Sequence, residues 1–283
     1  MTIAETILPR AQPYRVLPGF GPTLGLTVFF LSLIVIAPLG ALFAKPSGLG
    51  PREIAALLLT PRVAAAFRVS FGIAFAAAVV NGFIGLLVAW VLVRYEFPGR
   101  RLLDAMVDLP FALPTAVAGI ALASLYADTG WVGGLLAPLG IDVAFTPLGI
   151  FVALLFIGLP YVIRTVQPVL ADLEPEAEDA ALTLGASGSQ TFRRVVVPPL
   201  LPAVLTGIAL AFARGVGEYG SVIFIAGNMP GVSEIVPLLI VVRLEQFDYA
   251  GASVLAVAML VASFAGLLLV NLLQAWSRRR HGG

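Results

Sequence analysis

Long runs without charge are the feature that most limits what this chain can fold into. A membrane-spanning helix needs about 20 consecutive, mostly apolar residues. Runs of about that length or more lie at Leu17–Ala44, Val69–Val93, Leu109–Ala127, Val143–Ile163, Val195–Ala213 (resuming after Glu218 and continuing to Ala226) and Tyr249–Ser277. The sequence therefore predicts an all-α, polytopic membrane protein with six transmembrane helices.

The composition agrees with this class and argues against several others. Hydrophobic residues make up 59% and charged residues 12% of the 283 positions, and the mean hydropathy is +1.00, whereas soluble domains carry about 25% charged residues. A net charge of +1 gives no general attraction for nucleic acid. With no cysteine and one histidine, His281, neither a disulfide nor a metal centre is expected.

The basic residues between the predicted spans give their orientation, because cytosolic loops carry an excess of lysine and arginine. With the N-terminus inside, the inner side holds Arg10, Arg15, Arg94, Arg100, Arg101, Arg164, Arg193, Arg194, Arg278, Arg279 and Arg280. The outer side holds only Lys45, Arg52, Arg62, Arg68 and Arg243. Both termini are predicted to be cytosolic. The first run is about twice as long as a signal-peptide core and is expected to remain as a helix.

Three shorter segments are expected outside the spans. Pro51–Thr60 has apolar residues at helical spacing and predicts a short surface helix. Ala127–Gly149 is rich in glycine and predicts an outer loop with a short turn of helix. Pro237–Leu244 is strongly apolar but too short to span, so a re-entrant or interfacial piece is expected before the last helix.

The loop between the fourth and fifth spans, residues 172–194, carries the most specific pattern. Five acidic residues open it: Asp172, Glu174, Glu176, Glu178 and Asp179. Pro175 suits the first turn of a helix, and acids there complement the helix dipole. The small pair Ala180 and Ala181 lets another surface approach, and Gly185 should end the helix. A charged loop is often only a solvated connector, but the order of these elements favours a docking helix.

This order resembles a signature of ABC importer permeases, the EAA loop. Its form is Glu-Ala-Ala, three residues, Gly, nine residues, Ile-x-Leu-Pro. The matching positions here are Asp179, Ala180, Ala181, Gly185, Val195, Val197 and Pro198, with aspartate and two valines as conservative departures. In that family the loop forms a coupling helix held by the nucleotide-binding subunit. The resemblance implies the type I importer permease architecture, with Glu178, Asp179, Ala180, Ala181, Gly185 and Pro198 as ATPase-docking residues.

Energy for transport must then come from another subunit. The chain contains no G-x-x-x-x-G-K-[ST] run that would cradle phosphates. It also lacks a recognisable nucleophile–base or metal constellation, so no enzyme activity and no cofactor of its own are expected. ATP and Mg²⁺ are expected on a partner ATPase.

One pair of opposite charges falls inside a predicted span. Ionisable residues in a membrane are costly and usually face a cavity or one another. Arg214 and Glu218 have i,i+4 spacing, which predicts one helix face. With Tyr219, Ser221 and Asn228 they are candidates for the translocation path or gate. The alternative is a neutralised pair that only locks two helices together.

Two acids precede the third predicted span. Asp108 is expected to cap that helix rather than bind an ion, following the preference of aspartate for helix N-termini. Asp104 lies one turn earlier. The prolines in Leu109-Pro110 and Leu113-Pro114 should kink or loosen the helix that follows.

A narrower resemblance covers nearly the whole chain. The segments 108–119 (DLPFALPTAVAG), 158–170 (GLPYVIRTVQPVL), 213–230 (ARGVGEYGSVIFIAGNMP) and 244–253 (LEQFDYAGAS) are similar to the T-type subunit of sulfate/thiosulfate permeases. Molybdate permeases are related and share a Gly-Glu-aromatic-Gly core with Ala-Gly-Asn. The run in this chain favours sulfate.

The resemblance implies a multi-pass subunit of the bacterial inner membrane, in contact with lipid and with no nucleic acid partner. Its expected partners are a homologous W-type permease, two ATP-binding subunits and a periplasmic sulfate- or thiosulfate-binding protein. Residues 1–283 would form a single transmembrane permease domain that moves sulfate by alternating access. A molybdate/tungstate permease remains the alternative within this class, and a secondary anion transporter is the alternative outside it.

Overall fold

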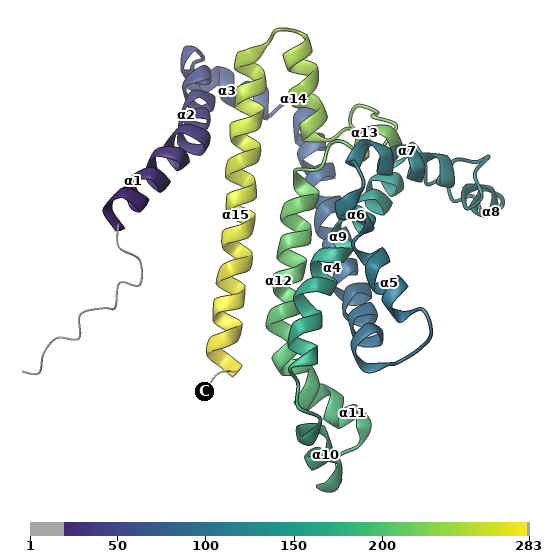
Figure 1. The fold of residues 1–283 in the computed structure, drawn as a ribbon. Helices are drawn as coiled ribbons and strands as arrows, with labels where there is room; N and C mark the ends of the chain where they lie inside the picture. The colour runs from purple at the N-terminus through teal and green to yellow at the C-terminus, as the bar shows by residue number, and fades with distance from the viewer. Residues whose placement is uncertain (1–19, 282–283) are drawn as a thin grey trace, which may run out of the picture. The chain divides into compact units, whose positions relative to one another are not determined.

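The computed structural model describes residues 20–281, except for the side chains at 47, 270, 271 and 273–281 (Figure 1). Its contacts divide the chain into two units, 1–45 and 46–283, which are described separately. The predicted inner-side residues Arg10 and Arg15 lie outside the described residues.

The first unit is one apolar helix of 25 residues, Phe20–Ala44. It consists of α1 (Phe20–Leu31), a π-helical turn η1 (Ser32–Ile36) and α2 (Ala37–Ala44). The π turn ends two residues before Pro38, which has no N–H and whose ring would collide with the carbonyl four residues earlier in a regular α-helix. At 1.5 Å per residue the helix is about 37 Å long, enough to cross a bilayer.

Three long helices form the core of the second unit: α4 (Pro61–Arg94), α9 (Pro147–Ala171) and α12 (Val197–Val216). Glycines let them approach closely. A Cβ on Gly85 of α4 would lie 2.7 Å from the Val162 side chain of α9, and one on Gly207 of α12 would lie 2.7 Å from the Cα of the same valine. Val162 is thus enclosed from two sides, so any larger residue at either glycine would separate the helices.

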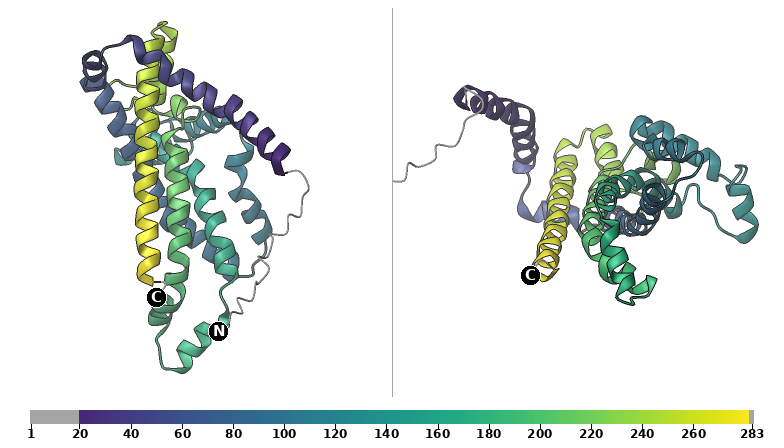
Figure 2. Two further views of the ribbon diagram at one scale, coloured as in Figure 1. Left: turned by 90° about the vertical axis from the view of Figure 1, so that its left-hand side faces the viewer. Right: turned by 60° about the horizontal axis from the view of Figure 1, so that its bottom comes forward.

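The remaining long helix, α15 (Tyr249–His281), packs beside α14 (Val236–Glu245) and α12. The short helices are η2 (Lys45–Gly48), α3 (Pro51–Leu58), α5 (Arg100–Val107), α6 (Leu109–Ala112), α7 (Thr115–Tyr126), α8 (Gly133–Leu136), η3 (Ala137–Leu139), α10 (Pro175–Thr183), α11 (Gly188–Thr191), η4 (Phe192–Val196) and α13 (Val222–Ile225). The expected helices in 51–60 and 127–149 are therefore present. Within the second unit, α10 and α11 lie at the end where α15 finishes, and the α14–α15 connection lies at the opposite end (Figures 1 and 2).

The third predicted span is not one helix. The α6 helix stops at Ala112, Leu113 and Pro114 are extended, and α7 begins at Thr115 and has only 12 residues. The break follows from Pro114, which cannot donate to the helix and disfavours helical geometry in the residue before it. Among the described residues, five helices are long and apolar enough to cross a membrane. The all-helical, polytopic fold is confirmed, and the count of six spans is approximate.

A buried ion pair joins the start of α4 to the segment before α14. Arg62 donates from Nε and Nη2 to the two carboxylate oxygens of Glu234 at 2.8 and 2.6 Å. The Glu234 side chain is 3% exposed, whereas that of Arg62 is 50% exposed. Removing the cation would leave a buried carboxylate without its counter-charge.

We expect Arg62→Leu to lower the free energy of unfolding by about 1–3 kcal/mol. This loss is at or below the lower end of what breaking a buried ion pair costs, because the Arg62 side chain is half exposed to solvent. Thermal unfolding of the purified protein in detergent measures this. Arg68→Leu is the matched control, because Arg68 lies on the same helix and is also exposed. Equal melting temperatures for the two variants would contradict the prediction.

Asp248 begins the last helix by accepting a 2.8 Å hydrogen bond from the Gly251 N–H and a 2.5 Å one from Arg243. The Arg243 hydrogen bond, and next the Gly251 N–H, hold the pKa of Asp248 below its usual range. Because the folded-state pKa is depressed, this contribution to stability is present above the unfolded-state pKa and lost as pH falls through the folded-state pKa. Asp248→Asn is therefore expected to narrow the difference in melting temperature between pH 7 and pH 3. If Asp248→Asn leaves the difference in melting temperature between pH 7 and pH 3 unchanged, this prediction is wrong.

Candidate functional site

The 172–194 loop contains the short helix that its sequence predicts. Helix α10 begins with Pro175 in its first turn, followed by the acids Glu176 and Glu178. Asp179 and Ala180 are exposed, and Ala181 is half-buried. Pro198 lies in the first turn of α12, after the π-helical turn η4.

The end of α10 is a Schellman motif built on Gly185. This glycine has φ +85°, a conformation that costs other residues energy because of their Cβ. The N–H of Ala186 donates to the Ala181 carbonyl at 3.0 Å, and that of Gly185 donates to the Leu182 carbonyl at 3.0 Å. The expected helix end is confirmed, and it leaves Leu184 88% exposed at the tip.

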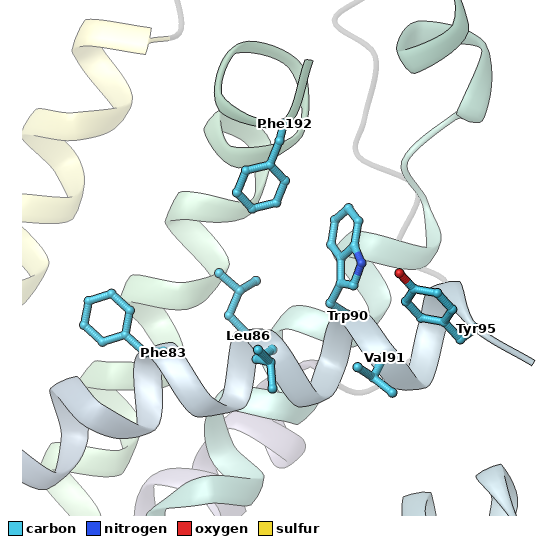
Figure 3. Close-up of a pocket in the computed structure, with 7 residues that line it drawn as sticks. Phe83, Leu86, Trp90, Val91, Tyr95 and Phe192 are labelled. Carbon is cyan, nitrogen blue, oxygen red and sulfur yellow. The ribbon is translucent and has the colours of Figure 1, made fainter. Parts of the chain in front are cut away.

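Helix α10 is tied to α4 by a residue that sequence analysis did not select. Arg94, at the end of α4, forms an ion pair with Glu178 of α10. The Arg94 guanidinium lies 5.3 Å from the centroid of the Trp90 ring, and Trp90 meets Phe192 of η4 edge-on at 5.6 Å. Figure 3 shows Trp90 and Phe192 side by side. The two ends of the loop are thus held on α4, one by charge and one by an aromatic contact.

The loop encloses a hollow of about 340 Å³ between α10 and α11, lined by Ala181, Leu184, Gly185, Ala186, Gln190, Thr191, Arg194 and Val195. Thr191 is buried there, and its hydroxyl has no hydrogen-bond partner among the described residues. The alanine and glycine of the predicted pattern therefore line a concave surface.

The predicted pair of charges is present, but not on one helix face. Helix α12 ends at Val216, and Glu218 lies two residues beyond it. Nη1 of Arg214 is 2.5 Å from Oε2 of Glu218, which is 3% exposed as a residue. The other carboxylate oxygen accepts two hydrogen bonds from Ser221, one from its N–H and one from its hydroxyl, each 2.9 Å. The buried carboxylate thus closes the turn that follows the helix.

The other two candidates take no part in the side-chain contacts of this pair. Tyr219 is half-buried and packs against the core. Asn228 has φ +54° and donates from its amide to the Ile223 carbonyl at 2.8 Å, whereas its amide oxygen is buried and has no partner among the described residues. Of the five predicted residues, the structure therefore joins Arg214, Glu218 and Ser221 and leaves Tyr219 and Asn228 outside their hydrogen bonds.

Helices α12 and α7, which are both interrupted within apolar segments, meet at the turn after α12. A Cβ on Gly220 would lie 2.2 Å from the Thr115 hydroxyl, and one on Gly119 would lie 2.3 Å from the Ser221 carbonyl. The turn after α12 therefore packs directly on the first turns of α7. Nothing local in the sequence identifies α7 as the neighbour of these glycines.

A second polar cluster replaces the cap expected of Asp108. The Asp108 side chain makes no capping hydrogen bond to α6. It accepts instead from Nε and Nη2 of Arg164 at 2.9 and 2.6 Å. The capping prediction was wrong because a bidentate guanidinium is a stronger partner than a single backbone N–H.

Arg164 of α9 uses its donors fully in this cluster. Besides Asp108, it donates to the Asp104 carboxylate at 2.7 Å, the Asp104 carbonyl at 2.8 Å and the Gln167 amide oxygen at 2.6 Å. The five hydrogen bonds match the five N–H groups of a guanidinium. Hydrogen bonds from Gln167, and next from Arg164, lower the pKa of Asp104. This cluster fastens α5 and α6 to α9.

Residues 81–282 match the family model described as "Binding-protein-dependent transport system inner membrane component". The matched region includes α9, the 172–194 loop, the turn after α12 and the part of α4 from Asn81 onward. The chain belongs to this family of permeases. It is a multi-pass membrane protein and a transport component, not an enzyme.

Relatives of this permease match along nearly their whole length. The "Sulfate transport system permease protein CysT" of Synechocystis sp. is 54% identical over 253 residues, covering 89% of this chain and 88% of the relative. The protein of the same name from Escherichia coli is 50% identical over 266 residues, covering 94% and 96%. These proteins and this permease are therefore similar over nearly their whole lengths.

The fold of the permease also matches solved ABC transporters. The structure of a bacterial alginate ABC transporter in complex with a pentasaccharide-bound periplasmic protein has a chain that aligns with a TM-score of 0.74 at 16% identity, covering 92% of this chain and 94% of the other. At that identity the match establishes the fold and no detail of the site. The ABC importer permease fold expected from the 172–194 loop is confirmed.

We expect Arg164→Lys in this permease to loosen α5 and α6 from α9, because an ammonium cannot reproduce the planar, bidentate arrangement. Hydrogen exchange of residues 100–112 should increase at least several-fold, while the buried middle of α9 stays protected. Arg101→Lys, an exposed residue of α5, is the control. Equal exchange in both variants would mean that packing alone holds α5 and α6 in place.

Proposed function

We propose that this permease is a transmembrane subunit of an ATP-driven importer for sulfate or thiosulfate. The observation that carries the proposal is the identity of 50–54% with sulfate transport permeases along at least 88% of each chain. The segments that resemble T-type sulfate permeases include the turn after α12, where Arg214, Glu218 and Ser221 are joined. The substrate assignment rests on these relatives, and the mechanism rests on the loop geometry as well.

In this proposal the α10 helix docks on the ATPase. The docking surface is formed or supported by Glu178, Asp179, Ala180, Ala181, Gly185 and Pro198. The hollow between α10 and α11 accepts a protruding side chain of the ATPase. The Arg94–Glu178 ion pair and the Trp90–Phe192 contact pass the motion of α10 to α4. A short helix braced on a long one moves as a rigid body, so closure of the ATPases is transmitted to the spans.

The turn after α12 is proposed as the gate, with Tyr219 and Asn228 along the path. Arg214 is largely neutralised by Glu218, so the pair is a poor binding site for an anion. It is better suited to hold the contact between α12 and α7 closed. Because these helices are both interrupted at that contact, a small rearrangement there would open a path between them.

The assembly proposed around this subunit contains a homologous W-type permease, two ATPases that bind ATP and Mg²⁺, and a periplasmic sulfate- or thiosulfate-binding protein. The subunit lies in the bacterial inner membrane with both termini in the cytosol, following the arginine distribution. The α10–α11 end of the second unit then faces the cytosol.

Uptake of labelled sulfate into proteoliposomes that contain the full assembly tests the proposal. We expect ATP-dependent uptake that excess unlabelled thiosulfate inhibits and molybdate does not, and none when an ATPase subunit inactive in hydrolysis is used. Uptake of molybdate in place of sulfate would keep the mechanism and overturn the substrate. Sulfate uptake that needs no ATP would indicate a secondary transporter and overturn the mechanism.

A further inference from the structure

Residues 100–112, which comprise α5 and α6, form a strap with a bending point at each end. Gly99, directly before the strap, has φ +88°, a backbone conformation that favours glycine. Leu113 and Pro114, directly after it, are extended, so α6 and α7 do not form one helix. Hinges are a few residues at the ends of elements that absorb large changes in backbone angles. The strap can therefore turn as a unit while the neighbouring helices stay folded.

Polar bonds from one arginine attach the strap to α9. Neither α5 nor α6 has a buried residue, and one aromatic contact, between Phe111 and Tyr161, joins the strap to α9 with ring centroids 5.2 Å apart. Arg164 makes four hydrogen bonds to Asp104 and Asp108, which are 2.6–2.9 Å long. Bidentate bonds of this kind are strong and depend closely on geometry. The strap is thus held mainly by bonds that form together and break together.

The groups on both sides of this attachment keep or find other partners when it breaks. Arg100 lies one turn before Asp104 on α5, at the spacing that lets opposite charges interact along a helix. On α9, Gln167 accepts a 2.6 Å hydrogen bond from Arg164 and would stay bonded to it. The side chains of Asp104 and Asp108 are 43% and 49% exposed, so water reaches them as well. Breaking the attachment therefore leaves no buried charge unpaired, which is the costly outcome for an ion pair.

The strap lies at the end of the second unit that carries the 172–194 loop. It follows the end of α4, where Arg94 pairs with Glu178 of α10. It leads through Pro114 into α7, which packs on the turn after α12. The 20 residues of α12 separate that turn, the proposed gate, from the loop. Alternating access needs a barrier on each side of the transported ion, and the strap is placed to supply the one at the loop end.

We propose that the strap, residues 100–112, is a second gate at the loop end of the permease and that Arg164 is its latch. During the transport cycle Arg164 releases Asp104 and Asp108, the strap turns about Gly99 and Pro114, and the bonds form again when it returns. Arg164 positions the strap and does not touch the ion. The inference rests on the proposed function for a cycle driven by ATP, but not for the identity of the ion.

The reactivity of a single cysteine tests whether the strap moves. The chain has no cysteine of its own, and Val107 of the strap is half-buried against the core. In Val107→Cys, a water-soluble maleimide should therefore react faster when the strap has turned. We compare the purified assembly in nanodiscs, with cysteine-free partner subunits, without nucleotide and with ATP bound to a hydrolysis-inactive ATPase. We expect labelling rates that differ about fivefold or more, following the population of the open strap. Equal rates would overturn the proposal, whichever ion is transported.

The same labelling tests whether Arg164 is the latch. Adding Arg164→Gln to Val107→Cys should give fast labelling in both nucleotide states, so that the rates differ less than about twofold. Arg101→Gln is the control, since Arg101 is an exposed residue of the same strap, and it should keep the full difference. If Arg164→Gln keeps it too, Arg164 does not hold the strap and the proposal is wrong.

A removable bridge tests whether transport needs the movement. Phe111→Cys and Tyr161→Cys are joined by a reducible bis-methanethiosulfonate, with bridging verified by mass. We expect ATP-driven uptake to fall about tenfold or more and to return on reduction, because the bridged strap stays on α9. Phe67→Cys with Phe71→Cys, a ring pair within α4, is the control and should transport normally when bridged. Normal uptake with the strap bridged would overturn the proposal. Absence of sulfate uptake before any bridging would instead overturn the proposed substrate, and the labelling rates would still decide whether the strap moves.

Discussion

Gly185→Trp is expected to remove most ATP-driven uptake while the transmembrane helices stay folded. Gly185 has φ +85° and ends α10, so any residue with a Cβ strains the helix end by about 1–2 kcal/mol. An indole there would also project from the surface proposed to meet the ATPase. Because a difference of about 1.4 kcal/mol is tenfold in an equilibrium constant, we expect uptake to fall about tenfold or more, with ATP hydrolysis retained in part.

Gly99→Trp is the matched control for this variant. Gly99 has φ +88°, and a Cβ at either glycine would meet nothing within 4 Å. Both substitutions therefore carry similar backbone strain and similar exposed bulk, but Gly99 precedes α5, outside the loop. Gly185→Asn should retain more uptake than Gly185→Trp, because asparagine tolerates this conformation. Normal uptake by Gly185→Trp, or an equal loss in Gly99→Trp, would contradict the docking assignment.

The features that the sequence predicted correctly have local causes. Uncharged runs locate the long helices because the membrane requires about 20 apolar residues regardless of their partners. Helix α10 was predicted in the same way, since Pro175 starts it and Gly185 ends it by their own backbone preferences. The prolines were expected only to kink or loosen the third span, and the break before α7 follows from one of them, Pro114.

The features that sequence analysis missed depend on residues far apart in the chain. Asp104 and Asp108 are separated from Arg164 by more than fifty positions, so a local preference suggested a cap where an ion pair forms. Arg94 and Glu178 are separated even further. Charges close in the sequence, Arg214 and Glu218, were paired correctly, but one helix face was predicted for them and α12 ends before Glu218.

The Arg214–Glu218 pair gives the second large expected effect. Arg214→Leu leaves the Glu218 carboxylate buried with Ser221 as its remaining partner. Removing one partner of a buried pair costs about 3–5 kcal/mol, so we expect a large drop in melting temperature and little folded protein in the membrane. Arg214 is one-third exposed, which places the expected loss toward the lower end of that range.

The double variant Arg214→Leu with Glu218→Gln separates a gate from a packing contact. Glutamine removes the uncompensated charge and still offers an oxygen to the Ser221 N–H and hydroxyl, so the turn after α12 keeps its hydrogen bonds. We therefore expect the double variant to regain most of the stability that Arg214→Leu loses, as coupled sites do. If the charges hold the α12–α7 contact in its closed state, uptake should stay low although the protein is folded, and ATP hydrolysis should no longer depend on substrate. Normal uptake by the stable double variant would mean that the pair only packs the helices, and the gate would then lie elsewhere.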